Sequence, residues 1–135
     1  MVGAGQLARM TGPAATELGI GFRLLADGPD DSAAKVWPDV EVGDYRSLDD
    51  LRAFAAGCDV VTFDHEHVPA AHLAALEEDG VLLRPGPAAL RFAQDKLAMR
   101  EALTELGVPC PRYTPVSDLA GVQQFADQAG WPVVL

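Results

Sequence analysis

Two glycines separated by one residue stand near the start of the chain, at Gly3 and Gly5. They follow a short apolar lead and come directly before apolar residues at helical spacing, which predicts a strand, a tight turn and a helix. Glycine suits such a turn because it adopts positive φ and lets a ligand approach the backbone closely. The N-terminus of the helix can then face an anion. This stretch predicts an α/β fold with a ligand site at its first turn.

The predicted helix carries apolar residues on one stripe, and we expect this stripe to pack on a sheet. Its members are Leu7, Met10, Ala14 and Leu18. A dinucleotide-binding fingerprint would have a third glycine where Ala8 stands. Only two residues precede Gly3, whereas a buried parallel strand runs to about five residues, so we expect further residues upstream.

Strands and helices alternate through the first ninety residues. Strands are predicted at 22–26, 40–42, 60–63 and 81–83, and helices at 47–58 and 69–79. The segment 60–63 is short and β-branched, which is typical of a central parallel strand. Strands joined through helices by short turns predict right-handed βαβ units in one parallel sheet.

The pattern changes after residue 86. Two helices are predicted at 87–94 and 95–106, followed by a proline-punctuated linker at 108–115. Ser117 is the predicted cap of a further helix that ends at Gly130, and an apolar strand follows at 131–135. We therefore expect one α/β domain over 1–90, a helical connector and linker over 91–115, and the unfinished start of a second domain over 116–135.

Composition excludes several classes of partner. Twenty acidic against ten basic residues give a net charge of −10, which disfavours nucleic acid and anionic membrane surfaces. No apolar run approaches the ~20 residues of a membrane span, and no signal peptide is visible, so we expect a cytoplasmic protein. Cys58 and Cys110 lack metal-ligand spacing, and we expect two reduced, buried thiols.

A dense polar cluster follows the predicted strand 60–63, with Asp64, His65, Glu66 and His67 in a row. The carboxyl ends of parallel strands are where α/β sheets bind ligands. Three interpretations stay open: a metal site that includes the histidines and His72, a loop in which Glu66 accepts hydrogen bonds from a ligand amine or hydroxyl, and a solvated loop. Adjacent positions on an extended loop point in different directions, which disfavours the metal site.

Two single residues also have a functional and a structural interpretation. Asp27 stands about twenty residues after the glycines, where a dinucleotide-binding fold places its ribose-binding carboxylate, although a plain turn residue is the favoured interpretation. Lys96 stands near a helix start, where a lysine is slightly unfavourable for the helix dipole. It is either a phosphate contact or a solvated side chain.

Four stretches together resemble one family. They are residues 3–10, 62–69, 94–96 and 106–109, and they occur in the order and spacing of the N5-carboxyaminoimidazole ribonucleotide synthases, which are ATP-grasp enzymes. The resemblance covers essentially the whole chain. It implies a Rossmann-like, parallel-sheet preATP-grasp domain followed by the first elements of an ATP-grasp domain.

The resemblance also implies an activity and site residues. The family uses ATP, Mg²⁺ and bicarbonate to carboxylate aminoimidazole ribonucleotide in purine synthesis, and it forms homodimers. By position, Gly5, Gln6, Leu7 and Glu66 match the ribonucleotide-facing loops, and Lys96 matches a residue that reaches the ATP phosphates. No catalytic residue and no Mg²⁺ ligand of the family falls in this chain, so the fragment alone is expected to be inactive.

Two departures and two other functions accompany this resemblance. Many members have glycine where Ala8 stands and glutamate where Asp64 stands, and we assign no role to Asp64. A related ATP-grasp ligase, such as the formate-dependent glycinamide ribonucleotide transformylase, shares the architecture, but Gln6 and Leu7 favour the first family. A non-catalytic nucleotide-binding Rossmann module would instead use Asp27 on a ribose.

Overall fold

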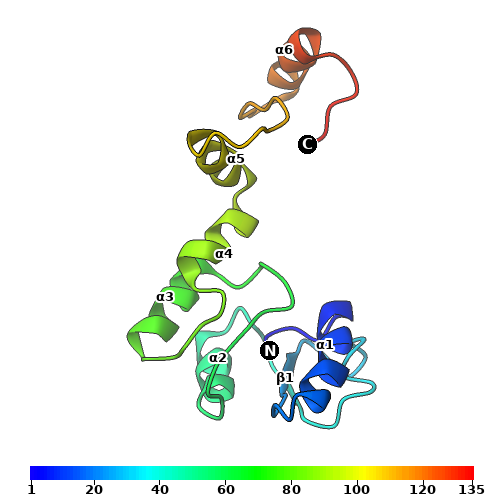
Figure 1. Cartoon of the computed structure of the whole chain (residues 1–135), viewed down its shortest axis with the longest axis vertical. Helices are drawn as coiled ribbons and strands as arrows, with labels where there is room; N and C mark the ends of the chain where they lie inside the picture. The colour runs from blue at the N-terminus through cyan, green and yellow to red at the C-terminus, as the bar shows by residue number, and fades with distance from the viewer. The chain divides into compact units, whose positions relative to one another are not determined.

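The chain forms two compact units in the computed structural model, which describes residues 1–135 in full. The first unit, Met1–Gln94, contains α1 (Gln6–Glu17), β1 (Leu24–Ala26), β2 (Val40–Val42), α2 (Leu48–Ala55), α3 (Ala70–Glu78) and α4 (Pro87–Gln94) (Figure 1). The second unit, Asp95–Leu135, contains α5 (Lys96–Glu105) and α6 (Leu119–Ala129). None of these helices has the length and apolar character needed to cross a lipid bilayer.

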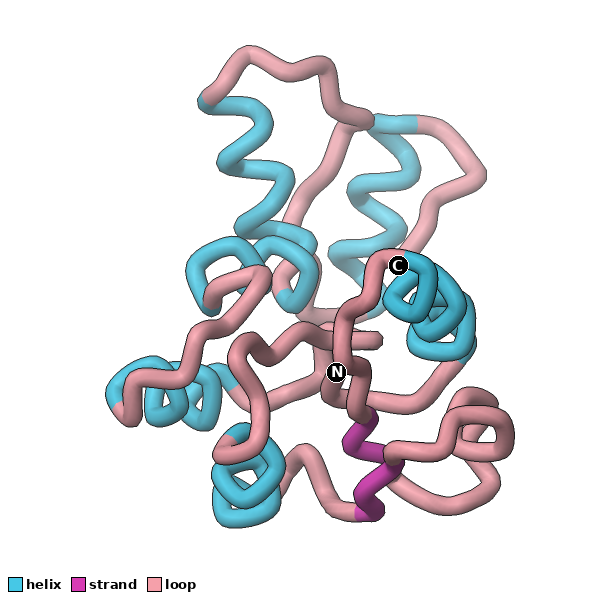
Figure 2. Tube along the Cα trace, turned by 60° about the horizontal axis from the view of Figure 1, so that its bottom comes forward, coloured by secondary structure: helices cyan, strands magenta, loops and turns pink.

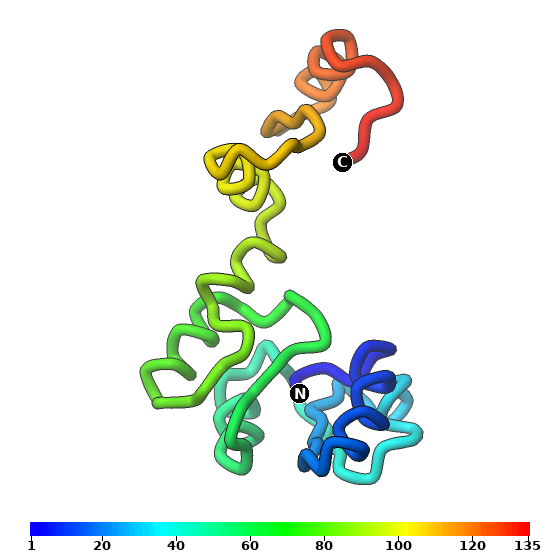
Figure 3. Tube along the Cα trace, in the orientation of Figure 1, coloured from blue at the N-terminus to red at the C-terminus, as the bar shows by residue number.

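The first unit is built on a parallel sheet. Strands β1 and β2 pair in parallel, with Leu24 opposite Val40. The strand segments are magenta in Figure 2. Parallel bridges then join Val2 to both β1 and Phe63, and Val61 to Leu83. Hence the order across the sheet is β2, β1, the segment around Val2, the segment 61–63 and finally Leu83. Helices lie between these segments along the chain, except between β1 and β2, where residues 27–39 form turns (Figure 3).

This arrangement confirms the predicted parallel α/β sheet and shortens several of its strands. The predicted strand 22–26 begins at Leu24, while 40–42 is found as predicted. The segments 60–63 and 81–83 contribute single bridges rather than continuous ladders. In chain order the segments lie as third, second, first, fourth and fifth, which matches the first five strands of the 3-2-1-4-5-6 order of a doubly wound nucleotide-binding fold.

Two apolar clusters hold the first unit together. The larger lies beneath α2 and α3 and surrounds Phe54, whose side chain is fully buried. The smaller lies beneath α1 and consists largely of small residues: Ala4, Ala8, Leu24, Ala26 and Ala33. Burial of these side chains supplies the main free energy that holds the helices on the sheet.

The predicted apolar stripe on α1 is wrong. Leu7, Met10 and Leu18 are 60%, 64% and 73% exposed, and the buried residues of α1 are instead Ala8, Gly12 and Ala15. The reason is close packing. A Cβ added at Gly12 would lie 2.6 Å from the ring of Trp37, so only a small-residue face fits against this part of the unit.

Helix ends follow the predicted signals to within a residue. Ser47 Oγ accepts a hydrogen bond from the Asp50 N–H at 3.3 Å and caps α2, as predicted. Gly107 and Gly130 adopt positive φ directly beyond α5 and α6. The cap of α6 is Asp118 rather than Ser117, since its carboxylate accepts from the Gly121 N–H at 2.8 Å.

Two further predictions are corrected in detail. Residues 131–135 form no strand, and the side chains of Val134 and Leu135 are almost fully exposed. A strand exists only where a neighbour completes its hydrogen-bond ladder, and no segment of the chain pairs with these residues. Both cysteines are free, as expected, but Cys58 and Cys110 are half-buried rather than buried.

The exposed stripe on α1 leads to a testable contrast between two leucines. Leu24 is fully buried beneath α1, whereas Leu18 is 73% exposed at its end. We expect Leu24→Ala to lower the free energy of unfolding by about 3 kcal/mol, and Leu18→Ala to change it by less than about 0.5 kcal/mol. Urea unfolding followed by circular dichroism measures both, and equal losses would contradict the packing of α1 described above.

Candidate functional site

The candidate site lies where the strand order of the sheet reverses. Val2 pairs with β1 on one side and with Phe63 on the other. The chain continues from Val2 into the glycine turn and from Phe63 into the loop 64–68, so both connections leave the same edge of the sheet side by side. In open α/β sheets this switch point forms the crevice in which ligands bind.

The glycine turn has the backbone geometry that its sequence predicts. Gly3 adopts a φ of +94°, which disfavours any residue with a side chain. A Cβ at Gly3 would lie 2.8 Å from the Cβ of Asp64, and one at Gly5 would lie 2.5 Å from the Asp64 carboxylate. Glycine is therefore needed here because another part of the chain, the loop after Phe63, approaches the turn closely.

Asp64 binds the start of α1 with both carboxylate oxygens. Oδ2 accepts a hydrogen bond from the Gly5 N–H, and Oδ1 accepts one from the Ala8 N–H at 3.0 Å. The Asp64 main chain is also held, since its N–H donates to the Val2 carbonyl at 2.8 Å. The anion that faces the N-terminus of α1 is therefore supplied, at least in part, by the protein itself.

Sequence reasoning assigned no role to Asp64, although a signal was available. Gly5 is the N-cap of α1 and has no side chain to accept a hydrogen bond, and the first turn of α1 contains no acidic residue. When the N-cap residue of a buried helix has no side-chain acceptor, the first N–H groups of the helix need a hydrogen-bond acceptor from another part of the chain. An acidic residue directly after the neighbouring strand is the natural source of that acceptor.

The loop that carries Glu66 is anchored a second time, by α4. The side-chain amide of Gln94 donates hydrogen bonds to the Glu66 carbonyl at 2.9 Å and to the Val68 carbonyl at 2.8 Å. Val68 itself is fully buried in the larger apolar cluster. This role of Gln94 was also missed from the sequence, because within residues 94–96 only Lys96 was considered as a site residue.

The predicted site residues fall on two different units. Gly5, Gln6 and Leu7 lie on one of the two loops that meet at the switch point of the first unit, and Glu66 lies on the other. Gln6 is exposed, and its Oε1 accepts from Ser32 Oγ at 3.3 Å. Lys96 is the first residue of α5 in the second unit, directly after the N-cap Asp95, whose carboxylate accepts from the Ala98 N–H at 3.0 Å.

The histidines of the loop form a ring cluster rather than a metal site. The ring centroids of His65 and Tyr45 are 4.6 Å apart, and those of His65 and His67 are 5.3 Å apart. Burial and then the neighbouring His67 lower the pKa of His65, which favours its neutral form. A neutral ring is also what the 3.2 Å hydrogen bond from the His67 N–H to His65 Nδ1 requires.

His72 takes no part in that cluster, since its Nε2 lies 2.9 Å from the Arg46 carbonyl. Across residues 1–135, no group of three or more His, Cys, Asp or Glu side chains is placed to hold a metal ion. The proposed metal site of His65, Glu66, His67 and His72 is therefore not formed. The loop in which Glu66 binds a ligand and the solvated loop are the two interpretations that remain.

Asp27 has the geometry of a turn residue. Its N–H and that of Gly28 both donate to Asp31 Oδ2, at 3.0 and 3.3 Å. Asp27 also lines an open cavity of about 350 Å³ at the ends of β1 and β2, together with Val42, Gly43, Asp44 and Arg46. Two carboxylates and one guanidinium line this cavity.

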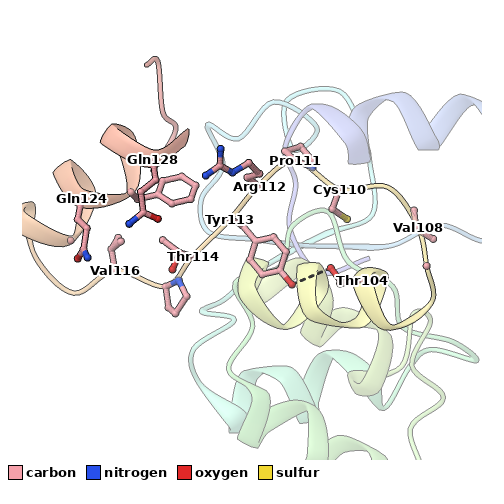
Figure 4. A pocket seen from close by; sticks show the side chains of 14 residues that line it. Thr104, Val108, Cys110, Pro111, Arg112, Tyr113, Thr114, Val116, Gln124 and Gln128 are labelled. Carbon is pink, nitrogen blue, oxygen red and sulfur yellow. Dashed lines mark hydrogen bonds between the residues drawn. The ribbon is translucent and has the colours of Figure 1, made fainter. Parts of the chain in front are cut away.

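The second unit has a larger open cavity of about 750 Å³ between α5, the segment 108–116 and α6 (Figure 4). Tyr113 bridges two of these walls, with its hydroxyl 3.1 Å from Thr104 Oγ1. The side chain of Arg112 also lines this cavity. The predicted linker 108–115 is thus extended and packed beside α5 through Tyr113.

Comparison with known proteins identifies the first unit. Residues 1–94 match the family described as the ribonucleotide synthetase preATP-grasp domain, and these are the residues of the first compact unit. The chain belongs to this family. The loops that meet at Asp64 are therefore two loops of a preATP-grasp domain.

Relatives extend the likeness over the whole chain. The N5-carboxyaminoimidazole ribonucleotide synthase of Mycobacterium bovis is 50% identical over 135 residues, which is 100% of this chain and 32% of that protein. The crystal structure of the N5-carboxyaminoimidazole ribonucleotide synthetase from Thermus thermophilus matches with a TM-score of 0.80 at 34% identity, over 98% of this chain and 37% of that chain.

A third match is the structure of a ligand complex. It is the N5-carboxyaminoimidazole synthase from Aspergillus clavatus in complex with ADP and 5-aminoimidazole ribonucleotide, with a TM-score of 0.80 and 28% identity, over 97% of this chain and 36% of that chain. The chain therefore spans about a third of the length of the proteins that it matches.

The contact between Gly3 and Asp64 in the preATP-grasp domain can be tested against a matched glycine. Gly80 has a similar φ of +84°, but a Cβ there would meet nothing within 4 Å. We expect Gly80→Ala to cost about 1 kcal/mol in unfolding free energy, from φ alone. Gly3→Ala should cost about 2 kcal/mol more, because its Cβ also collides with Asp64. Chemical unfolding measures the difference, and equal costs would rule out the close approach.

Proposed function

We propose that this preATP-grasp domain is part of an ATP-grasp ligase that carboxylates 5-aminoimidazole ribonucleotide. The reaction uses ATP and bicarbonate and gives N5-carboxyaminoimidazole ribonucleotide, ADP and phosphate. The observation that carries this proposal is the joining of the glycine turn to the Glu66 loop at the switch point, through both oxygens of Asp64. The likeness to the Aspergillus clavatus structure with ADP and 5-aminoimidazole ribonucleotide supports the choice of ligand.

The joined loops suit a ribonucleotide in two ways. The N–H groups of Gln6 and Leu7 lie in the first turn of α1, where a helix offers no internal acceptor. They therefore suit a phosphate, carbonyl or hydroxyl oxygen of the ligand. Glu66 supplies a carboxylate, which accepts hydrogen bonds from an amine or a sugar hydroxyl. Gly5 contributes the absence of a side chain, since its own N–H already binds Asp64.

The remaining partners in this proposal depend on residues outside the first unit. Lys96 contacts the ATP phosphates from the start of α5. Mg²⁺ serves as the metal cofactor of the proposed reaction, and no group of His, Cys, Asp or Glu side chains in residues 1–135 is placed to hold it. The complete enzyme is a cytoplasmic homodimer that binds bicarbonate and does not bind nucleic acid, in keeping with the net charge of −10.

The activity can be tested on a protein that contains this chain and is as long as the synthases that it matches. We expect ADP release from ATP and bicarbonate to depend on 5-aminoimidazole ribonucleotide, with the ribonucleotide itself carboxylated. A coupled assay of ADP release, with and without the ribonucleotide, measures this dependence. ADP release that is the same in both conditions, or that responds to another amine instead, would overturn the proposed function.

The role of Glu66 can be tested with a matched glutamate. Glu66→Gln keeps the size of the side chain and removes its charge, so the KM for the ribonucleotide should rise by about tenfold while the KM for ATP stays within about twofold. Glu78→Gln, at the exposed end of α3, should change neither KM. Equal increases in both KM values for Glu66→Gln would contradict a ribonucleotide contact.

A further inference from the structure

Asp64 joins the two candidate ligand loops of the first unit. It belongs to the loop that carries Glu66, and its carboxylate binds the N–H groups of Gly5 and Ala8 on either side of Gln6 and Leu7. We propose that Asp64 is a positioning residue for ribonucleotide binding, which holds the N–H groups of Gln6 and Leu7 at a set place relative to Glu66. This role rests on the function proposed above.

The hydrogen-bond pattern requires a carboxylate at this position. Two main-chain donors, the Gly5 and Ala8 N–H groups, point at two different oxygens of one side chain. An ionised carboxylate only accepts hydrogen bonds, so it satisfies both donors. A carboxamide of the same shape has one accepting oxygen and one NH₂ group, and it would place a donor against a donor. Asparagine at residue 64 therefore loses one of the two contacts.

Steric constraint makes this contact rigid. The Asp64 N–H is bound to the Val2 carbonyl at 2.8 Å, so the main chain of residue 64 is fixed to the first segment of the sheet. The carboxylate lies so close to the turn that only glycine fits there, because a Cβ at Gly5 would lie 2.5 Å from Asp64 Oδ2. The turn therefore cannot shift toward Asp64, and the two hydrogen bonds keep it from moving away.

Glu66 lies between this contact and a second anchor. Asp64, two residues before Glu66, is bound to α1. The carbonyl of Glu66 itself accepts a hydrogen bond from the Gln94 side-chain amide at 2.9 Å. A short loop held at both ends has few main-chain conformations, so the place of Glu66 relative to α1 depends on both anchors. Loss of the Asp64 contact frees the start of α1 from the Glu66 loop, while the Gln94 anchor keeps the loop on α4.

This role predicts a change in the KM for the ribonucleotide and not in the KM for ATP, measured in the same longer protein that is used to test the activity. Asp64→Asn should raise the KM for 5-aminoimidazole ribonucleotide by about tenfold or more, with the KM for ATP within about twofold of the wild type. Asp64→Glu keeps both accepting oxygens and should recover part of the ribonucleotide affinity. Asp59→Asn, an exposed aspartate before the same strand segment, should leave both KM values unchanged.

A structural readout accompanies the kinetics. Hydrogen exchange measured by mass spectrometry should show faster exchange in the segment that contains the Gly5 and Ala8 amides in Asp64→Asn than in the wild type, with α3 unchanged as the internal reference. Faster exchange in α3 as well, together with equal increases in both KM values, would mean a general loss of stability and would overturn the positioning role.

The two proposals fail in different ways. A wild-type protein whose ADP release does not depend on the ribonucleotide would overturn the proposed function. A wild type with that dependence, and an Asp64→Asn variant with an unchanged KM for the ribonucleotide, would overturn the positioning role alone. A selective increase in this KM that is partly reversed in Asp64→Glu supports both.

Discussion

The geometry of the candidate site depends on one charge-assisted contact, between the Asp64 carboxylate and the N–H groups that open α1. A helix without its own cap leaves several donors without acceptors, and Gly5 provides no cap of its own. A carboxylate at this end also interacts favourably with the helix dipole. Because Asp64 comes from the neighbouring segment of the sheet, the same contact that completes the helix also joins the two loops at the switch point.

Close packing around this contact explains the composition of the first residues. Gly3 and Gly5 leave room for Asp64, and Gly12 leaves room for Trp37. The buried face of α1 consists of small residues, so the helix lies close to the sheet, and its large apolar residues, such as Leu7 and Met10, are exposed. The glycine turn therefore adapts to a neighbouring protein segment, and the Gln6 and Leu7 N–H groups are the ones in this stretch that Asp64 does not bind.

Local patterns predicted most of the fold and part of the site. Alternating strands and helices, the Ser47 cap and the glycines beyond α5 and α6 depend on neighbours within a few residues, and the structure confirms them. The stripe on α1 was wrong because apolar spacing shows which face is apolar and not which neighbour it meets. The roles of Asp64 and Gln94 were missed because their partners lie 59 and 28 residues away in the chain.

The sequence by itself determined the parallel α/β class, the glycine turn, the loop that contains Glu66 and the likeness to one family of ribonucleotide synthetases. Only the tertiary structure decided which donors at the start of α1 are already bound, which face of α1 is buried, and how the Glu66 loop is anchored on both sides. The physical reason is range. Turn and helix preferences act over a few bonds, whereas a carboxylate finds distant amide donors only after the sheet has brought their segments together.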